Sequence, residues 1–202
     1  KPDEGAVLRN GTQIRLTSPR HGLQNGIAMV HQHFRLVDRF TVAENVGKYL
    51  SNIYPEIKCT ILITDAICSR HELGSNTFVI SPSDLSLSPD KISAMRSYYD
   101  AVEFATAMKP YLLSYLLVQG AVTATFLDPD TQVYGSLDGV FEMAEECDAV
   151  LTPHRLTPIE SNSNFYSEKT FLAYGIYNLG FISVGKSSFN LLAWWESRLL
   201  FD

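Results

Sequence analysis

The stretch Ala124-Thr125-Phe126-Leu127-Asp128-Pro129-Asp130 indicates the fold of this chain. Residues 121–127 are apolar or β-branched, which is typical of a buried strand. The strand ends at two carboxylates that flank Pro129, a residue that fixes its own φ angle and keeps Asp128 extended. Such an ending predicts either an ordinary turn, because Asp and Pro favour turns, or a site for a hard divalent cation.

Asp128 and Asp130 suit Mg²⁺ or Mn²⁺ in particular. These ions prefer oxygen ligands and usually share them with the phosphates of a substrate. In open α/β sheets, ligands bind beyond the carboxyl ends of the strands. We therefore treat the two carboxylates as candidate metal ligands.

The composition indicates a globular protein. Of the 202 residues, 46% are hydrophobic and 19% are charged, and the formal net charge is -6. The negative charge argues against a nucleic-acid partner, because such proteins normally carry a basic patch. Three scattered cysteines, Cys59, Cys68 and Cys147, argue against a disulfide framework. We expect a cytoplasmic protein without a signal peptide or an integral membrane segment.

The charge distribution predicts two parts that meet near Gly47. Residues 1–47 carry six Lys or Arg and four Asp or Glu, whereas residues 48–202 carry ten and eighteen. This change in charge marks a candidate domain boundary. We expect residues 1–47 to form a small β-rich segment and residues 48–202 to form a separate α/β domain.

Short local signals organise the first part. Asn10-Gly11 lies between the expected strands 6–8 and 13–16, a pattern that strongly predicts a β-hairpin. Ser18 and Pro19 are typical of a helix start, and the helix is expected to end near Gln24. A second strand is expected over residues 27–30.

Two segments of the first part resemble a known family. Residues 26–34, Gly-Ile-Ala-Met-Val-His-Gln-His-Phe, and residues 41–46, Thr-Val-Ala-Glu-Asn-Val, are similar to the Q-loop region of ATP-binding cassette importer ATPases. The resemblance covers about the first 46 residues. It implies that Gln32 reaches a catalytic magnesium ion and a water molecule.

Residues 180–187, Gly-Phe-Ile-Ser-Val-Gly-Lys-Ser, match the pattern G-x-x-x-x-G-K-[ST], but we do not interpret them as a phosphate-binding loop. That motif requires a loop between its two glycines, whereas residues 181–184 favour a strand. The order is also wrong, because the phosphate loop of a cassette precedes its Q-loop. The signature motif and the second acidic motif of a working cassette do not follow either.

The second part alternates strand and helix patterns, which predicts a mainly parallel, Rossmann-like sheet with helices on both faces. The expected strands are residues 58–64, 78–80, 121–127, 149–152, 176–177 and 180–184. A helix is expected from Ser88-Pro89-Asp90, with a break or restart at Pro110 and an end at the C-cap Gly120. Further helices are expected over residues 137–147, 168–174 and 188–200.

Five segments in order resemble DxD-containing nucleotide-sugar glycosyltransferases with a GT-A-like fold. They are residues 103–110 (Glu-Phe-Ala-Thr-Ala-Met-Lys-Pro), 126–130 (Phe-Leu-Asp-Pro-Asp), 151–154 (Leu-Thr-Pro-His), 177–181 (Tyr-Asn-Leu-Gly-Phe) and 194–195 (Trp-Trp). The resemblance covers residues 48–202. It implies transfer of a sugar from a nucleoside-diphosphate sugar to an unknown acceptor, with Mn²⁺ or Mg²⁺ as cofactor.

The resemblance also implies residue roles. The implied donor-site residues are Thr106, Lys109, Asp128, Asp130, Asn178 and Gly180, of which the two aspartates hold the metal. A lysine before a proline is equally typical of a solvated helix end, and its ammonium would suit a phosphate as a point charge. His154 is either a buried, hydrogen-bonded histidine or a contact to the acceptor or metal. Trp194 and Trp195 are expected to pack in the core, and no catalytic base is identified.

Three interpretations follow from these two resemblances. The first is a metal-dependent glycosyltransferase domain that is C-terminally truncated and fused to a cassette-like segment. The alternative is a fragment of the ATP-binding subunit of an importer, which would act with a transmembrane partner. The third is an inactive remnant that retains binding alone. The first two differ in the nucleotide expected, a nucleoside-diphosphate sugar with Mn²⁺ or ATP with Mg²⁺.

Overall fold

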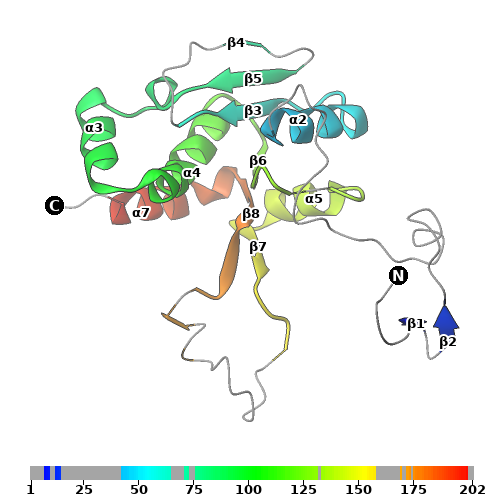
Figure 1. The fold of residues 1–202 in the computed structure, drawn as a ribbon. Helices are drawn as coiled ribbons and strands as arrows, with labels where there is room; N and C mark the ends of the chain where they lie inside the picture. Colours follow the sequence, from blue (N-terminus) through cyan, green and yellow to red (C-terminus); the bar gives the residue numbers. More distant parts are fainter. Residues whose placement is uncertain are drawn as a thin grey trace. The chain divides into compact units, whose positions relative to one another are not determined.

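The computed structural model divides the chain into two compact units, Lys1–Leu36 and Val37–Asp202 (Figure 1). The residues that it describes are 7–9, 12–14, 42–64, 71–72, 76–131, 133–157, 169, 172–173 and 175–199.

The first unit contains the β-hairpin that the sequence predicts. Strand β1 (Val7–Arg9) pairs antiparallel with β2 (Thr12–Ile14), and Arg9 lies opposite Thr12 across the Asn10-Gly11 connection. The expected short helix to Gln24, the strand over residues 27–30 and Gln32 lie outside the described residues.

The second unit begins its described part with helix α2 (Val42–Ile53). Gly47, where the sequence places a boundary, lies buried inside this helix. A Cβ atom at Gly47 would lie 3.3 Å from the Sγ atom of Cys59, so α2 packs closely on the strand that follows it. The change in charge at Gly47 therefore falls within one packed element of the second unit.

Six strands of the second unit form two small sheets. In the first, β3 (Cys59–Leu62) pairs in parallel with β5 (Thr77–Ile80), and β4 (His71–Glu72) pairs antiparallel with the other side of β5. In the second, β8 (Tyr177–Gly185) lies between β6 (Thr123–Leu127) and β7 (Ala149–Pro153) and is antiparallel to both.

The expectation of a mainly parallel sheet is wrong for the described strands, of which only β3 and β5 pair in parallel. Strand β8 returns between β6 and β7 instead of crossing over to run beside them in the same direction. It is also one continuous strand, although the sequence predicts two pieces over residues 176–177 and 180–184. The fold is therefore mixed α/β with small parallel and antiparallel sheets.

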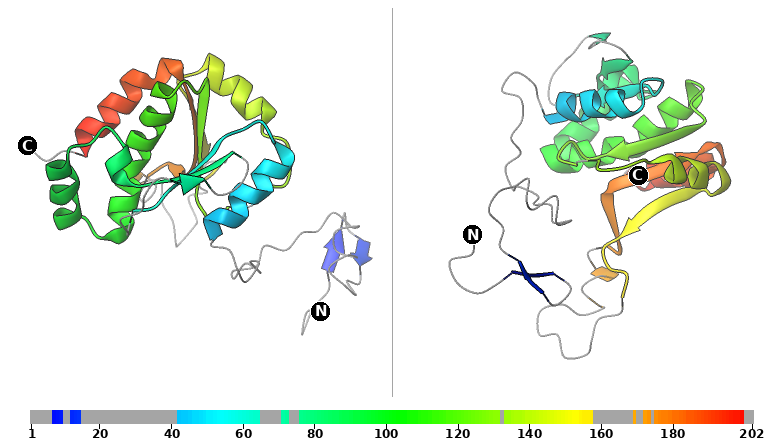
Figure 2. Two further views of the ribbon diagram at one scale, coloured as in Figure 1. Left: turned by 90° about the horizontal axis from the view of Figure 1, so that it is seen from above. Right: turned by 90° about the vertical axis from the view of Figure 1, so that its right-hand side faces the viewer.

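Helices lie on both sides of these strands, as Figure 2 shows. On one side are α3 (Pro89–Tyr98), α4 (Ala101–Val118) and α7 (Phe189–Arg198), and on the other are α2 and α5 (Asp138–Glu146). Short 3₁₀ turns, Pro82–Asp84 and Lys186–Ser188, precede α3 and α7. None of the described helices has the length and apolar character needed to cross a membrane.

The sequence predicts a break of the helical region at Pro110, but the break lies near Asp100 instead. The Asp100 side chain accepts hydrogen bonds of 2.8 Å from the backbone N–H groups of Val102 and Glu103, and Glu103 accepts one of 3.0 Å from the N–H of Asp100. This capping box starts α4 at Ala101. Pro110 lies buried within α4, where packing outweighs the lost backbone hydrogen bond. Gly120, with φ of 98°, follows the end of α4 as expected.

Helix α4 contributes to both hydrophobic clusters of the second unit. The first cluster joins α4 to α3 and the end of β5, and its buried residues include Ile80, Leu85, Met95, Phe104 and Met108. The second joins α4 to β6, β8 and α7 through Leu113, Leu117, Ala124, Ile182, Val184 and Leu192. Helix α4 is thus the element against which the rest of the described core packs.

Gly185 is expected to be intolerant of a side chain. A Cβ atom there would overlap the carbonyl oxygen of Ala144 in α5, which is backbone and cannot rotate away. Gly185→Ala should therefore lower the free energy of unfolding by about 1–3 kcal/mol, as overpacking does. Gly139→Ala is the matched control, because a Cβ atom there meets nothing within 4 Å. That variant should gain about 0.5–1 kcal/mol as a helical alanine. Urea unfolding measures both, and equal midpoints would contradict this packing.

Candidate functional site

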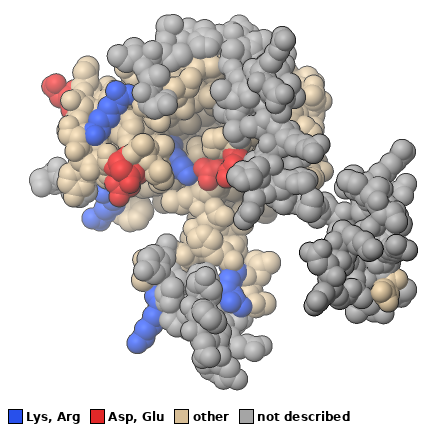
Figure 3. Space-filling model, viewed as in Figure 1, with Lys and Arg blue, Asp and Glu red and all other residues tan. Residues whose placement is uncertain are grey.

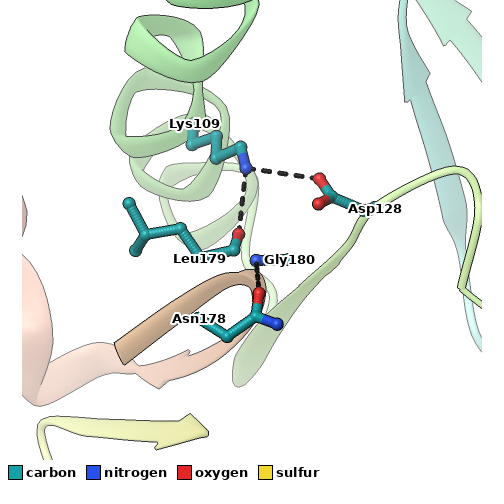
Figure 4. A network of polar contacts seen from close by, with 5 residues as sticks. All are labelled: Lys109, Asp128, Asn178, Leu179 and Gly180. Atoms are coloured by element: carbon teal, nitrogen blue, oxygen red, sulfur yellow. Dashed lines mark hydrogen bonds and ion pairs between the residues drawn. The ribbon is translucent and has the colours of Figure 1, made fainter. Parts of the chain in front are cut away.

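A polar cluster at the end of β6 joins side chains from α4, β6 and β8 (Figure 4). The ammonium of Lys109 donates a hydrogen bond of 2.9 Å to the carbonyl oxygen of Leu179 and lies 3.3 Å from Oδ1 of Asp128. On β8, the backbone N–H of Gly180 donates to Oδ1 of Asn178 at 2.7 Å. Four of the six predicted donor-site residues therefore lie together: Lys109, Asp128, Asn178 and Gly180.

Backbone hydrogen bonds hold Asp128 at the end of its strand. Its N–H donates to the carbonyl oxygen of Gly180 at 2.8 Å, which extends the pairing of β6 with β8 by one residue. Its carbonyl oxygen accepts from the N–H of Thr131 at 2.9 Å and so closes a turn over Pro129 and Asp130. The turn that the sequence allows is present, and the Asp128 carboxylate still reaches the cluster.

Lys109 is buried, so the solvated helix end that the sequence also allows is not observed. Its side chain is 9% exposed, and its ammonium lies 4.4 Å from the centre of the Phe126 ring. A buried ammonium is costly unless polar groups surround it. Here the Asp128 carboxylate, the Leu179 carbonyl and the face of Phe126 replace water.

Gly180 allows the Asp128 carboxylate to approach β8. A Cβ atom at this position would lie 2.8 Å from Oδ2 of Asp128 and 2.9 Å from Oδ1 of Asn178. Both distances are shorter than a carbon atom tolerates. The glycine therefore leaves free the space that these two side-chain oxygens border.

The other predicted site residues are not part of this cluster. Asp130 is exposed in the turn, and Thr106 is half-buried one helical turn before Lys109 in α4. His154 is exposed at the end of β7, where its Nδ1 lies 3.1 Å from the carbonyl oxygen of Gly175, so the buried alternative does not hold.

The Trp-Trp pair also differs from expectation. Trp195 packs against the second hydrophobic cluster, but Trp194 is 56% exposed, with the guanidinium of Arg198 5.7 Å from its ring centre. The helical period of α7 places consecutive residues on different faces, so only one tryptophan faces the core.

The donor set fits a shared metal ion better than a metal held by protein alone. Among the described residues, no group of three or more His, Cys, Asp or Glu side chains is placed to hold a metal ion. The two candidate carboxylates are Asp128, whose Oδ1 is paired with Lys109, and Asp130, which lies exposed in the turn outside the cluster. Two carboxylates leave an octahedral shell incomplete, so water and phosphate oxygens of a ligand would have to fill it.

The described charged residues do not form a field of one sign on the face drawn in Figure 3. On the face drawn in Figure 3, acidic and basic side chains of the described residues are interspersed. A nucleic-acid partner would be expected to meet a contiguous basic patch.

Sequence reasoning missed two partners of Lys109. The carbonyl of Leu179 carries no signal, because every residue has one. Phe126 does carry a signal, since it lies two residues before Asp128 and period-2 alternation places both on the same face of β6.

Gly180→Ala should disturb the cluster and leave the fold intact. The added methyl group meets the ends of two side chains that can rotate, so the Asp128 carboxylate should turn away and lengthen its contact with Lys109 beyond 4 Å. A crystal structure of the variant measures this separation. Gly135→Ala, where a Cβ atom meets nothing within 4 Å, is the matched control. An unchanged contact in Gly180→Ala would show that the glycine does not set the position of Asp128.

Comparison with known proteins finds relatives of one short segment. The glucose import ATP-binding protein TsgD13 of Haloferax volcanii is 54% identical over 44 residues, which are 22% of this chain and 8% of that protein. The guanosine import ATP-binding protein NupO of Bacillus subtilis is 48% identical over 46 residues, 23% of this chain and 9% of that protein. The ribose import ATP-binding protein RbsA of Rhodopirellula baltica is 51% identical over 45 residues, 22% of this chain and 9% of that protein.

This chain thus spans less than a tenth of the length of these relatives. No protein-family model matches the chain, and no solved structure matches it. The matches support the cassette resemblance and bring no support for the glycosyltransferase resemblance. A short segment of this chain, about a fifth of its length, is therefore similar to ATP-binding proteins of importers.

Proposed function

We propose that the second unit binds a nucleoside-diphosphate sugar and is the donor-binding domain of a metal-dependent glycosyltransferase. One observation carries this proposal. Lys109, Asp128 and Gly180 are far apart in the chain, yet they lie in one cluster with Asn178 at the carboxyl end of β6. An ammonium, a carboxylate and a glycine gathered in one place suit a phosphate-bearing ligand that shares a metal ion.

Each residue of the cluster has a chemical task in this proposal. The ammonium of Lys109 attracts the diphosphate as a point charge. Asp128 and Asp130 hold Mn²⁺ or Mg²⁺ jointly with diphosphate oxygens, and Asn178 offers an exposed amide to the sugar hydroxyls. The metal, when bound, stabilises the negative charge of the departing diphosphate.

A second proposal concerns the short segment and is favoured by the comparisons, which back it better than they back the first. The relatives are named as import ATP-binding proteins. We infer that residues 1–46, which carry the Q-loop resemblance, derive from a cassette ATPase that uses ATP with Mg²⁺ and works with a transmembrane partner. Gln32 would contact the magnesium ion. Because less than a tenth of each relative is matched, hydrolysis and import are proposals for this chain.

The donor-site proposal predicts that metal and nucleotide bind cooperatively. In calorimetry, UDP or GDP should bind about 5- to 150-fold more tightly with Mn²⁺ than without it, the usual range of coupling between two ligands. Asp130→Asn should reduce this coupling by about tenfold, as loss of a metal-site partner does, and leave folding intact because Asp130 is exposed. Asp148→Asn, also exposed, is the control. Equal nucleotide affinity with and without Mn²⁺ would remove the metal site.

The cassette proposal predicts a different nucleotide and a different sensitive residue. ATP with Mg²⁺ should bind the full chain, and Gln32→Ala should weaken it about tenfold because a magnesium contact is lost. Gln13→Ala, exposed in β2, removes the same side chain elsewhere in the first unit and should have no effect. Fluorescence titration with an ATP analogue measures both variants. If Asp130→Asn weakened ATP binding and Gln32→Ala did not, the nucleotide would belong to the second unit.

A further inference from the structure

The ammonium of Lys109 is the cation that pairs with Asp128 in this structure. Its Nζ lies 3.3 Å from Oδ1 of Asp128, and the lysine side chain is 9% exposed while the aspartate side chain is 39% exposed. The lysine therefore reaches the carboxylate from inside the protein, and solvent reaches it from outside. A metal ion arriving from solvent meets a carboxylate whose charge is already balanced.

We propose that Lys109 is a positioning residue that occupies Asp128 in the ligand-free protein and releases it to the metal when a diphosphate arrives. The inference rests on the proposed donor site and deepens it, because it names how metal and nucleotide are coupled. Lys109 thereby makes the site respond to the two ligands together instead of to the metal alone.

Simple electrostatics carries this inference. A divalent ion at Asp128 would lie a few ångströms from the lysine ammonium, and two positive charges at that distance repel each other strongly in a partly buried site. Without a ligand anion, Lys109 therefore lowers the metal affinity of Asp128. A diphosphate brings negative charge that attracts both cations, so the same lysine raises the affinity for the nucleotide.

The other contacts of Lys109 keep it in the site when it leaves Asp128. Its ammonium is bonded to the Leu179 carbonyl at 2.9 Å and faces the Phe126 ring at 4.4 Å. These two contacts do not depend on the carboxylate. A small rotation about the end of the side chain can therefore exchange an aspartate oxygen for a phosphate oxygen without opening the core.

The inference predicts effects of opposite sign when the charge of Lys109 is removed. In Lys109→Met, Mn²⁺ alone should bind about tenfold more tightly, because the nearby positive charge is gone. UDP without metal should bind about tenfold more weakly, because the phosphate loses its point charge. Lys109→Arg keeps the charge and should retain the weak metal binding of the parent protein. Lys186→Met removes an exposed lysine and should change neither affinity.

Calorimetric titration of the full chain and its variants, with Mn²⁺ alone and then with UDP alone, measures these affinities. Thermal melting of each variant reports folding, and Lys109→Gln, which can still donate to the Leu179 carbonyl, serves if Lys109→Met does not fold. If Lys109 had only a structural role, its replacement would lower the affinities for Mn²⁺ and UDP together. That outcome would overturn the inference. So would unchanged Mn²⁺ affinity in both neutral variants.

The same titrations separate this inference from the donor-site proposal. If the parent protein couples Mn²⁺ to UDP but the neutral variants bind Mn²⁺ no better, the donor site stands and the inference falls. If the parent protein shows no coupling and Lys109→Met gains Mn²⁺ affinity, Lys109 does block Asp128, but its release by a diphosphate and the donor function are both wrong.

Discussion

The buried ammonium of Lys109 is the interaction on which the site of the second unit depends. The interaction joins three elements: α4 carries Lys109, the end of β6 supplies Phe126 and Asp128, and β8 supplies the Leu179 carbonyl. Because an unpaired buried charge is costly, all three elements must be in place before the lysine can be buried. The site is therefore assembled only with the tertiary structure around it.

Helix α4 makes this burial possible. It runs without a break through Pro110 and carries Lys109 on the same helix as residues of both hydrophobic clusters. A break at Pro110 would separate the lysine from the core that orients it. The capping box at Asp100 and the packing of α4 on both sides outweigh the hydrogen bond that the proline cannot make.

The polar cluster and the cassette resemblance belong to different parts of the chain. The relatives match about a fifth of it and are import ATP-binding proteins. The polar cluster belongs to the second unit, and its chemistry, an ammonium and a carboxylate beside a glycine, suits a phosphate-bearing ligand with a shared metal ion. The two proposals therefore differ in the nucleotide, the metal ion and the residue that each would require.

The sequence by itself determined the features that depend on neighbouring residues. Asn10-Gly11 specified the hairpin, Gly120 ended α4, and the β-branched interior of residues 181–184 predicted a strand in place of a phosphate loop. It also placed Asp128 directly after a strand. These signals are local backbone preferences, so a few residues suffice to read them.

Only the tertiary structure decided the direction of β8, the continuity of α4 and the pairing of Lys109 with Asp128. The patterns of residues 121–127 and 180–184 show that strands exist but not which way they run beside each other, because alternation is the same for parallel and antiparallel pairs. The sequence around Lys109 likewise does not indicate that its side chain is buried. Its partners lie 19 and 70 residues away, and contacts of that range form only when the whole core packs.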